Sequence, residues 1–339
     1  MSRPCAAVLA LIGLASPVPG AAQTTTAGWT VAAGEYTVFG HTVYTSGWVL
    51  QPRIVLDSVA KVDSARVVDS VRLAAARPVG LAAGLSAWPA DLYCDGITSG
   101  AMQSLEPKAI LGRLQLASRC GVRLVIVPPQ RLITATGVNR GPFSADSAKR
   151  LMDRYAAVLP PDTLRKYRGT ILGMNLADDY GCADCWGGTP ITQAQIAAWA
   201  AYARAKLPGI PLGVRVTPDW VAAYPALAPH LDYAWAQYHT RKGDPRAYYD
   251  NAARVAERLG LRVIMGVNVE DCYGVGTSAC AAEDLVRLGT MAVTHPASCA
   301  FINWRYSEST WVREDIRKAW DGLLAVARGR EARECRRAV

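Results

Sequence analysis

The chain is poor in phenylalanine and histidine, with three and four residues among 339, and only 19% of its residues are charged. The four histidines lack metal-ligand spacing, so we expect no metal site, and no organic cofactor is implied. After residue 22 no apolar run is long enough to cross a bilayer. A hydrophobic content of 51% nevertheless supports a sizeable core, in one large domain or two ordinary ones.

Residues 1–22 have the pattern of a secretory signal. Arg3 supplies the positive end, residues 6–15 the apolar stretch, and residues 20–22 a small-residue cleavage site. Two prolines interrupt an apolar run that is already too short for a membrane helix. We therefore expect a secreted or periplasmic protein without a membrane span.

Eight cysteines remain once Cys5 leaves with the signal, and an even number in an exported protein favours disulfide bonds. Close spacing predicts the pairs Cys182–Cys185 and Cys272–Cys280. Cys299 begins an expected strand and Cys335 follows the last expected helix, so both could lie at the same end of the fold and form a third pair. Cys94 and Cys120 then remain for each other. The alternative for Cys182-Ala-Asp-Cys185 is a redox motif, but an oxidising compartment and the missing thioredoxin pattern favour a structural link.

The net charge is +9, and loss of Arg3 with the signal leaves +8. Much of the excess is arginine in expected helices and in a basic C-terminal tail, residues 329–339. A nucleic-acid surface is one interpretation. No aromatic-basic RNA motif is present, so we favour solvated helix faces and a loose tail, with no nucleic-acid partner.

From residue 79 onward, short apolar runs alternate with helical patterns. The expected strands are 80–87, 123–128, 171–178, 212–217, 233–238, 262–269 and 299–305. The expected helices are 107–120, 144–158, 191–206, 218–229, 245–259, 280–292 and 312–328. Gly121 and Gly260 follow two of these helices, as helix stops should. Strict alternation predicts a parallel sheet covered by helices.

The fold class that fits best is α/β, a TIM (β/α)8-type barrel over residues 79–328. Seven units are clear, and residues 23–78, a segment whose structure the periodicity does not decide, would supply an incomplete or irregular first unit. An open doubly wound sheet is the alternative. It would usually carry a Gly-rich phosphate loop after its first strand, and Gly84-Leu-Ser86-Ala-Trp88 is not such a loop.

Two of the expected strands end in acidic residues, in Gly173-Met-Asn-Leu-Ala-Asp178-Asp179 and Gly266-Val-Asn-Val-Glu270-Asp271. In the first, the bulky residues at 172, 174 and 176 share one face and the small or polar residues share the other. If the bulky face packs on helices, Asp179 and Glu270 reach the same barrel mouth. A carboxyl pair there is what glycosidic bond cleavage requires.

Other polar and aromatic residues gather at the carboxyl ends of the expected strands, where the active sites of such barrels lie. Aromatic faces stack on sugar CH groups and charged groups bind hydroxyls, so we expect these residues to bind substrate: Trp88, Arg215, Gln237, Tyr238, Trp304 and Tyr306. Each has an alternative role. The tryptophans could fill the core, Asp178 and Asp179 could cap a turn, and Arg215 could be a buried partner of either acid.

The segment Ile171-Leu-Gly-Met-Asn-Leu-Ala-Asp-Asp-Tyr-Gly-Cys-Ala-Asp-Cys-Trp-Gly-Gly188 resembles a stretch of secreted bacterial TIM-barrel proteins that look like glycoside hydrolases. Residues 234–238, 266–269 and 301–306 are similar to the same group, so the resemblance covers about residues 80–325. In that group the strand usually ends Asp-Glu-Pro before a Cys-x-x-Cys-Trp-Gly-Gly loop. The resemblance implies the barrel fold more directly than a reaction.

Counted back from the last strand, 171–178 is the fourth strand of eight and 262–269 the seventh. Resemblance to the large retaining-glycosidase clan then implies that Asp179 is the acid/base and Glu270 the nucleophile, with Trp304 stacked on the sugar. Asp179 stands where Glu is usual and Tyr180 where Pro is usual. Asp271, rather than Glu270, is the alternative acid after the seventh strand.

The first hypothesis is therefore an exported glycoside hydrolase-like enzyme acting on an oligo- or polysaccharide, with Asp178, Asp179, Glu270 and Asp271 as candidate catalytic groups. The second is a non-catalytic barrel that binds carbohydrate or cell wall. The third is an envelope protein whose basic tail adheres to anionic polymer.

Overall fold

The computed structural model describes residues 80–274 and 279–337, together with short strands between residues 23 and 50. The chain divides into two units, residues 1–74 and 75–339. The expected signal, residues 1–22, lies outside the described residues, as does the stretch from 51 to 79. In the described part, no helix has the length and apolar character needed to cross a membrane.

The first unit contains a three-stranded antiparallel sheet in the order β1-β2-β5 and a separate pair, β3 and β4. The bounds of these strands are β1 (Gln23–Thr25), β2 (Gly28–Val31), β3 (Gly34–Val38), β4 (His41–Thr45) and β5 (Trp48–Leu50). None of these strands belongs to the barrel sheet. The expectation that residues 23–78 supply a barrel unit is therefore wrong for the strands described there.

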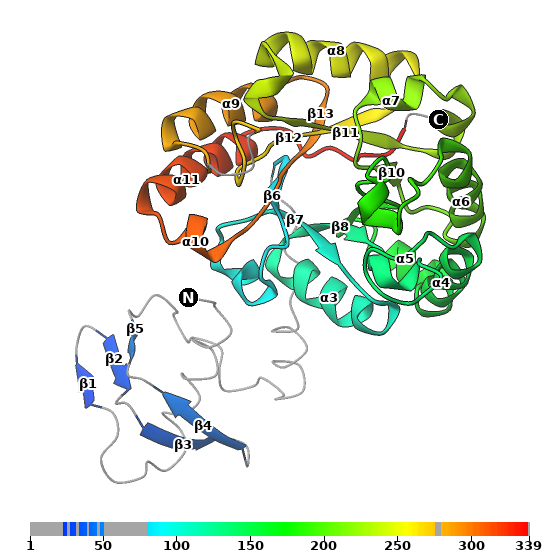
Figure 1. The fold of residues 1–339 in the computed structure, drawn as a ribbon. Coiled ribbons are helices and arrows are strands. Elements are labelled where there is room, and N and C mark those ends of the chain that lie inside the picture. Colours follow the sequence, from blue (N-terminus) through cyan, green and yellow to red (C-terminus); the bar gives the residue numbers. More distant parts are fainter. Residues whose placement is uncertain are drawn as a thin grey trace. The chain divides into compact units, whose positions relative to one another are not determined.

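The second unit is a closed barrel of eight parallel strands with alternating helices, which confirms the TIM-barrel prediction (Figure 1). The strands are β6 (Ala82–Ser86), β7 (Gly100–Ser104), β8 (Arg123–Val127), β9 (Ile171–Asn175), β10 (Leu212–Val214), β11 (Tyr233–Tyr238), β12 (Arg262–Val267) and β13 (Ser298–Asn303). The ring closes where β13 pairs with β6. The strand that the sequence analysis missed is β7. The fourth and seventh strands are nevertheless β9 and β12, as counted.

Helices surround the strands, and most match the predicted ranges, but the helix expected over 218–229 is the short α7 followed by the 3-10 turn η5. They are α3 (Pro107–Cys120), α4 (Ala145–Val158), α5 (Pro161–Lys166), α6 (Gln193–Lys206), α7 (Pro218–Ala222), α8 (Pro245–Arg258), α9 (Ala282–Thr294), α10 (Glu308–Trp311) and α11 (Glu314–Arg328). Short 3-10 turns lie at η2 (Ala90–Asp95), η3 (Gln130–Leu132), η4 (Ala183–Trp186), η5 (Pro225–His230) and η6 (Thr240–Lys242). Gly121 adopts the left-handed conformation that ends α3, as expected.

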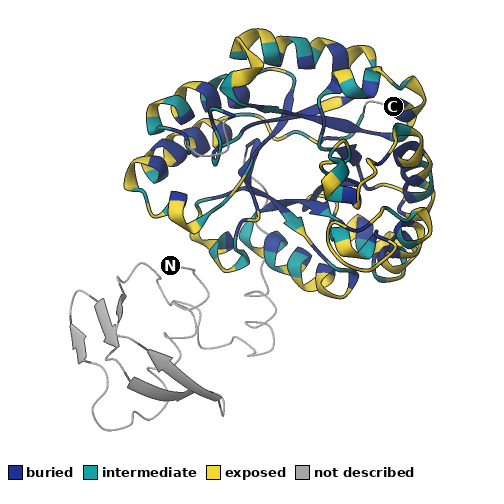
Figure 2. Cartoon of the chain, viewed as in Figure 1, coloured by how far each residue is buried: buried dark blue, intermediate teal, exposed yellow. Residues whose placement is uncertain are grey.

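The strands are buried on both faces, so the core has two layers (Figure 2). The inner layer includes Tyr233 and Trp235. Tyr233 fits because glycines lie beside it: a Cβ built on Gly173 or Gly213 would come within 2.5 or 2.2 Å of its ring. The absence of side chains at these two positions makes room for one large aromatic ring inside the barrel.

The expected side-chain faces of β9 need one correction. Met174 packs in the outer layer, as predicted, but Leu172 packs in the inner layer. The pairing of β8 with β9 shifts register between Leu124 and Val125, so that Val125 opposes Gly173. This irregularity inserts one residue and changes the side on which Leu172 lies. Asn175 and Gly173 still face inward.

All four expected cysteine pairs are disulfides: Cys94–Cys120, Cys182–Cys185, Cys272–Cys280 and Cys299–Cys335. The last one attaches the C-terminal segment to the start of strand β13, and Cys335 is fully buried. The guanidinium of Arg337 donates to the carbonyl of Ala228 at 3.1 Å. The expectation of a loose tail is therefore wrong for the described residues up to 337, which lie against the N-terminal ends of the strands.

Candidate active site

The acids after β9 meet an arginine from the neighbouring strand. Arg215 directly follows β10, and its Nε lies 2.7 Å from Oδ1 of Asp178. Its Nη2 lies 3.6 Å from Oδ1 of Asp179. The strands β9 and β10 pair in parallel, so their carboxyl ends fall at the same mouth of the barrel. Arg215 therefore contacts these acids, as the alternative interpretation of this residue expected.

Burial raises the pKa of Asp178 to about 6, while the positive charge of Arg215 acts in the opposite direction. The side chain is 30% exposed, so solvent or a ligand can reach it. A carboxyl group that is half protonated near pH 6 and still reachable has the property that a general acid needs.

Asp179 differs from its neighbour in both conformation and exposure. Its φ is +48°, which is unusual for a residue other than glycine, and its side chain is 61% exposed. Two donors hold its carbonyl oxygen: the backbone N–H of Cys182 at 2.8 Å and Nε1 of Trp186 at 3.0 Å. The Cys182–Cys185 disulfide lies in this same turn. The Cys-x-x-Cys loop therefore fixes the backbone on which both acids lie.

An aromatic ring lies directly beneath Arg215. The guanidinium carbon is 4.1 Å from the centre of the Trp304 ring and 6.0 Å from that of Trp235. Arg215 is only 13% exposed, and no hydrogen-bond partner for its Nη1 is found among the described residues. A cation at this distance from a tryptophan face is stabilised by the charge distribution of the ring.

Trp304 also connects this cluster with the acid after β12. The guanidinium carbon of Arg305 is 5.5 Å from the same ring centre, and its Nε is 2.9 Å from Oε2 of Glu270. Nη2 of Arg305 lies 3.4 Å from the other oxygen of Glu270. The Glu270 side chain is 36% exposed. The acids of β9 and β12 are thus linked through two arginines that both lie near Trp304.

The turn that carries Glu270 and Asp271 is held by its own contacts. Oδ1 of Asn268 accepts the backbone N–H of Asp271 at 2.9 Å, and the N–H of Val269 binds the carbonyl of Trp304. The Cys272–Cys280 disulfide follows at once. Each acidic turn of the mouth is therefore followed by a disulfide.

Two predicted substrate-binding residues do not line the mouth. Trp88 is fully buried in the outer layer against Trp311 and Trp320. Ala87 has a φ of +59°, so the alternation of β6 ends before residue 88. Tyr238 is also buried in the outer layer, where it contacts Tyr248 and Tyr249 of α8. These two predictions are wrong on placement.

The remaining predicted binding residues lie at the rim in different surroundings. Gln237 is partly exposed on the inward side of β11, between Trp235 and the strand end. Tyr306 is partly buried, and its ring centre is 5.6 Å from that of Trp88. Its backbone N–H binds the carbonyl of Ser86 at 2.9 Å. Gln237 is therefore better placed than Tyr306 to face a ligand in the barrel.

Sequence analysis did not assign roles to three residues of this mouth. Arg305 holds Glu270, Trp186 holds the Asp179 carbonyl, and Asn175 is buried with an Oδ1 that has no partner among the described residues. Arg305 was visible as a charged residue after the last strand. The role of Trp186 depends on a backbone carbonyl four residues beyond a strand, which no sequence pattern displays.

Within the described ranges no group of three or more His, Cys, Asp or Glu side chains is arranged to hold a metal ion. The charged and aromatic groups in contact at this mouth include the carboxylates of Asp178, Asp179 and Glu270, the guanidinium groups of Arg215 and Arg305, and the indole ring of Trp304.

No family model matches the sequence, and no curated protein matches it. Many solved structures share the fold. A candidate glycoside hydrolase from Parabacteroides distasonis aligns with a TM-score of 0.50 and 10% identity over 75% of this chain and 95% of its own. A GH18 chitinase from Pseudoalteromonas aurantia aligns at 0.46 and 11%, over 71% and 99%. A β-mannanase from Thermomonospora fusca aligns at 0.46 and 11%, over 74% and 92%. At 10% identity, the similarity to the Parabacteroides distasonis structure shows a shared barrel fold.

Proposed function

We propose that the chain is an exported glycoside hydrolase-like enzyme that cleaves an oligo- or polysaccharide at the barrel mouth. One observation carries the proposal: acids from the ends of β9 and β12 are joined through Arg215 and Arg305, which both lie near Trp304. Two carboxyl groups beside an aromatic platform are the requirements for cleaving a glycosidic bond. The four disulfides suit an oxidising compartment.

Asp178 is the proposed proton donor, in place of Asp179. A general acid must hold its proton near the working pH, and burial raises the pKa of Asp178 to about 6. The carboxyl of Asp179 is largely exposed. In this proposal Asp179 shapes the turn and adds negative charge beside Asp178, which further favours protonation of Asp178.

Glu270 is the proposed second carboxyl. It would attack the anomeric carbon if the two groups stand about 5 to 5.5 Å apart with substrate bound, or activate a water at about 6.5 to 9.5 Å. Arg305 orients Glu270 through their ion pair, and Trp304 would stack on the sugar. Asp271 is the reserve candidate for this role.

The second candidate function is a carbohydrate-binding barrel without turnover. It is favoured by one observation: Asp178 and Glu270 each already contact an arginine, at 2.7 and 2.9 Å. An acid neutralised by a fixed cation is a poorer proton donor. Both carboxyl groups remain partly exposed, however, so neither ion pair is closed to a ligand.

The test is a glycan-library screen of the chain from residue 23, reading both binding and released reducing ends. On the best substrate, Asp178→Asn should lower kcat by about 10²- to 10⁴-fold and retain affinity. An aryl glycoside with a good leaving group needs no proton, so it should restore most of the rate. Asp179→Asn is the matched control and should lose much less. Binding without turnover in the unsubstituted protein would support the second candidate.

A further inference from the structure

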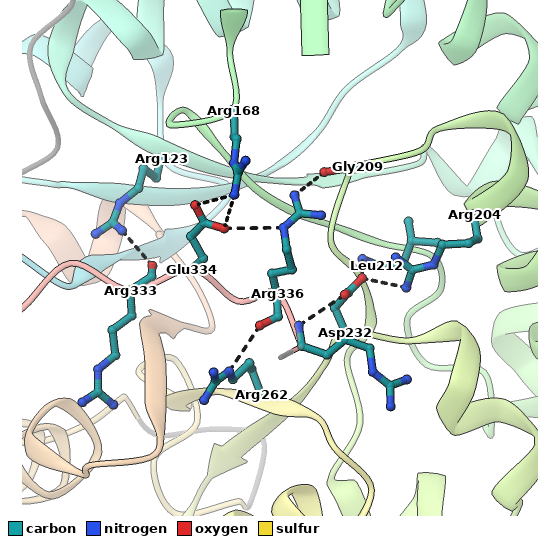
Figure 3. A network of polar contacts seen from close by, with 11 residues as sticks. Arg123, Arg168, Arg204, Gly209, Leu212, Asp232, Arg262, Arg333, Glu334 and Arg336 are labelled. Carbon is teal, nitrogen blue, oxygen red and sulfur yellow. Dashed lines mark hydrogen bonds and ion pairs between the residues drawn. The ribbon is translucent and has the colours of Figure 1, made fainter. Parts of the chain in front are cut away.

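The end of the barrel opposite the mouth carries an excess of guanidinium groups (Figure 3). Arg123 begins β8 and Arg262 begins β12, so both mark the N-terminal ends of the strands. Residues 330–337 run across this end, tied there by the Cys299–Cys335 disulfide. The arginines labelled in Figure 3 come from strands (Arg123, Arg262), from the turn before β9 (Arg168), from α6 (Arg204) and from this segment (Arg333, Arg336). The carboxylates labelled among them are Glu334 and Asp232.

Asp232 is occupied by partners of its own. Its Oδ2 lies 2.7 Å from Nη2 of Arg204 and accepts the backbone N–H of Leu212 at 2.8 Å. Glu334 is shared between two cations, Arg168 at 3.3 Å and Nε of Arg336 at 3.5 Å. One carboxylate thus faces two guanidinium groups, which leaves positive charge uncompensated.

Among these arginines, Arg123 has the least compensated positive charge. It is only 6% exposed, and its Nη1 and Nη2 donate to the carbonyls of Arg333 at 3.0 Å and Gly80 at 2.6 Å. Its Nε has no hydrogen-bond partner in the described ranges. Burial lowers the pKa of Arg123 to about 10. Neutral carbonyls satisfy hydrogen-bond donors but do not cancel a charge, and an uncompensated buried charge is costly.

A cavity of about 250 Å³ opens beside this residue. Four arginines and one carboxylate line it: Arg123, Arg168, Arg333, Arg336 and Glu334. The remaining wall is mostly apolar or glycine, and includes Ile171, Leu172 and Pro211. The guanidinium of Arg333 points away and donates to the carbonyl of Pro296, so the charges of the other four side chains sum to about two positive units.

We propose that this cavity binds a phosphate group, as free phosphate or as the end of a phosphate ester. Planar guanidinium groups form paired hydrogen bonds with tetrahedral oxyanions, and a phosphate carries close to two negative charges at neutral pH. Such a ligand offsets most of the excess charge around Arg123. It would also tie the strand arginines to those of the C-terminal segment, so its binding should stabilise the attachment of residues 330–337.

A purely structural role for these arginines is the competing explanation. Several of them donate to backbone carbonyls and so hold the segment in place, for example Arg262 to the carbonyl of Arg336 at 3.2 Å. This role predicts no preference for phosphate over other anions at equal ionic strength. The two explanations therefore differ in a measurable way.

The experiment measures phosphate binding to the full chain by calorimetry and by thermal unfolding. Phosphate is compared with chloride at the same ionic strength. Arg168→Gln and Arg336→Gln should each weaken binding of inorganic phosphate about tenfold. Arg150→Gln is the control: it removes an equal charge from the exposed face of α4, where Arg150 bonds only to Ser147 among the contacts described. Comparison with this control removes the general stabilising effect of phosphate as a salt.

Phenyl phosphate provides the second arm of the experiment. If inorganic phosphate raises the unfolding temperature and phenyl phosphate does not, the site binds the free ion. If both compounds raise it, the site binds the end of a phosphate ester. Either result supports the proposal. Equal phosphate protection in Arg336→Gln, Arg168→Gln and Arg150→Gln would overturn it. Binding of long polyphosphate without binding of phosphate would overturn it as well, because a charged surface and not this cavity would then be the site.

Discussion

The guanidinium carbon of Arg215 lies 4.1 Å from the centre of the Trp304 ring while its Nε contacts Asp178 at 2.7 Å. One arginine thus touches both an acid and an aromatic platform. The indole face and the carboxylate restrain the guanidinium from two sides, which fixes the position of Asp178 relative to Trp304. Any sugar stacked on Trp304 would be placed within a defined distance of that acid.

Stability should reveal the raised pKa of Asp178 without any substrate. The folded pKa is about 6 and the unfolded value is about 4, so the folded state binds the proton more tightly. The contribution of Asp178 to the free energy of unfolding should be complete below about pH 4 and fall as pH rises through about 6, by at most about 3 kcal/mol. Asp178→Asn should lack this decline. Urea unfolding at pH 4 and pH 7 measures the difference, and parallel pH curves for the two proteins would contradict it.

Replacement of Arg215 should change the titration of Asp178. Arg215 lowers the pKa of Asp178, so Arg215→Met should move the midpoint above 6 and increase the protonated fraction of the carboxyl at neutral pH. Carboxyl carbon NMR, assigned by comparison with Asp178→Asn, reports the midpoint. Arg305→Met is the control because Arg305 pairs with Glu270 instead. A midpoint that falls, or an equal shift in both variants, would refute the prediction.

Gly213 should not tolerate a side chain, because an added Cβ would lie 2.2 Å from the buried Tyr233 ring. Gly213→Ala should therefore destabilise the fold by about 1 to 3 kcal/mol. Gly112, within α3, has no atom within 4 Å of an added Cβ. Gly112→Ala should stabilise by about 0.5 to 1 kcal/mol, since alanine favours the helix. Thermal or urea unfolding of both variants checks the opposite signs.

The disulfides should contribute unequally to stability. Cys182–Cys185 spans three residues and Cys299–Cys335 spans 36. Loop entropy predicts a loss of about 2 kcal/mol for the Ser pair at 182 and 185, and about 4 kcal/mol for the Ser pair at 299 and 335. Urea unfolding measures both. Replacement of Cys182 and Cys185 should nevertheless reduce any hydrolytic activity more than replacement of Cys299 and Cys335, because the first disulfide holds the turn of Asp179. A larger loss of activity in the 299/335 variant would argue against that role.

The barrel was predictable from residues because most strands are flanked by long amphipathic helices. The strand β7 was not, because Gly-Ala-Met-Gln-Ser has little β-branched character and only the short η2 turn separates it from β6. The count of strands depended on the alternation of strands and helices, and no long helix separates β6 from β7. The sequence therefore predicted eight strands but assigned the missing one to residues 23–78, and only the structure identifies it as β7.

Placement of single side chains followed strand alternation only where the strand was regular. Gln237 and Tyr238 are adjacent, so they cannot both face into the barrel, and Tyr238 is the one that faces out. The left-handed residue Ala87 displaces Trp88 in the same way. Asp178 and Asp179 were both proposed as acids from sequence, but the difference between them comes from burial and from Arg215, which only the folded chain defines.

The order of the four disulfides has a consequence for how the chain matures. From residue 94 onward the cysteines pair two by two in sequence order, the first with the second and the third with the fourth, so no two links interleave. Eight cysteines permit on the order of a hundred pairings. If oxidation keeps pace with the emergence of the polypeptide, nearest-neighbour joining alone gives the native set, so production should be insensitive to loss of a disulfide isomerase.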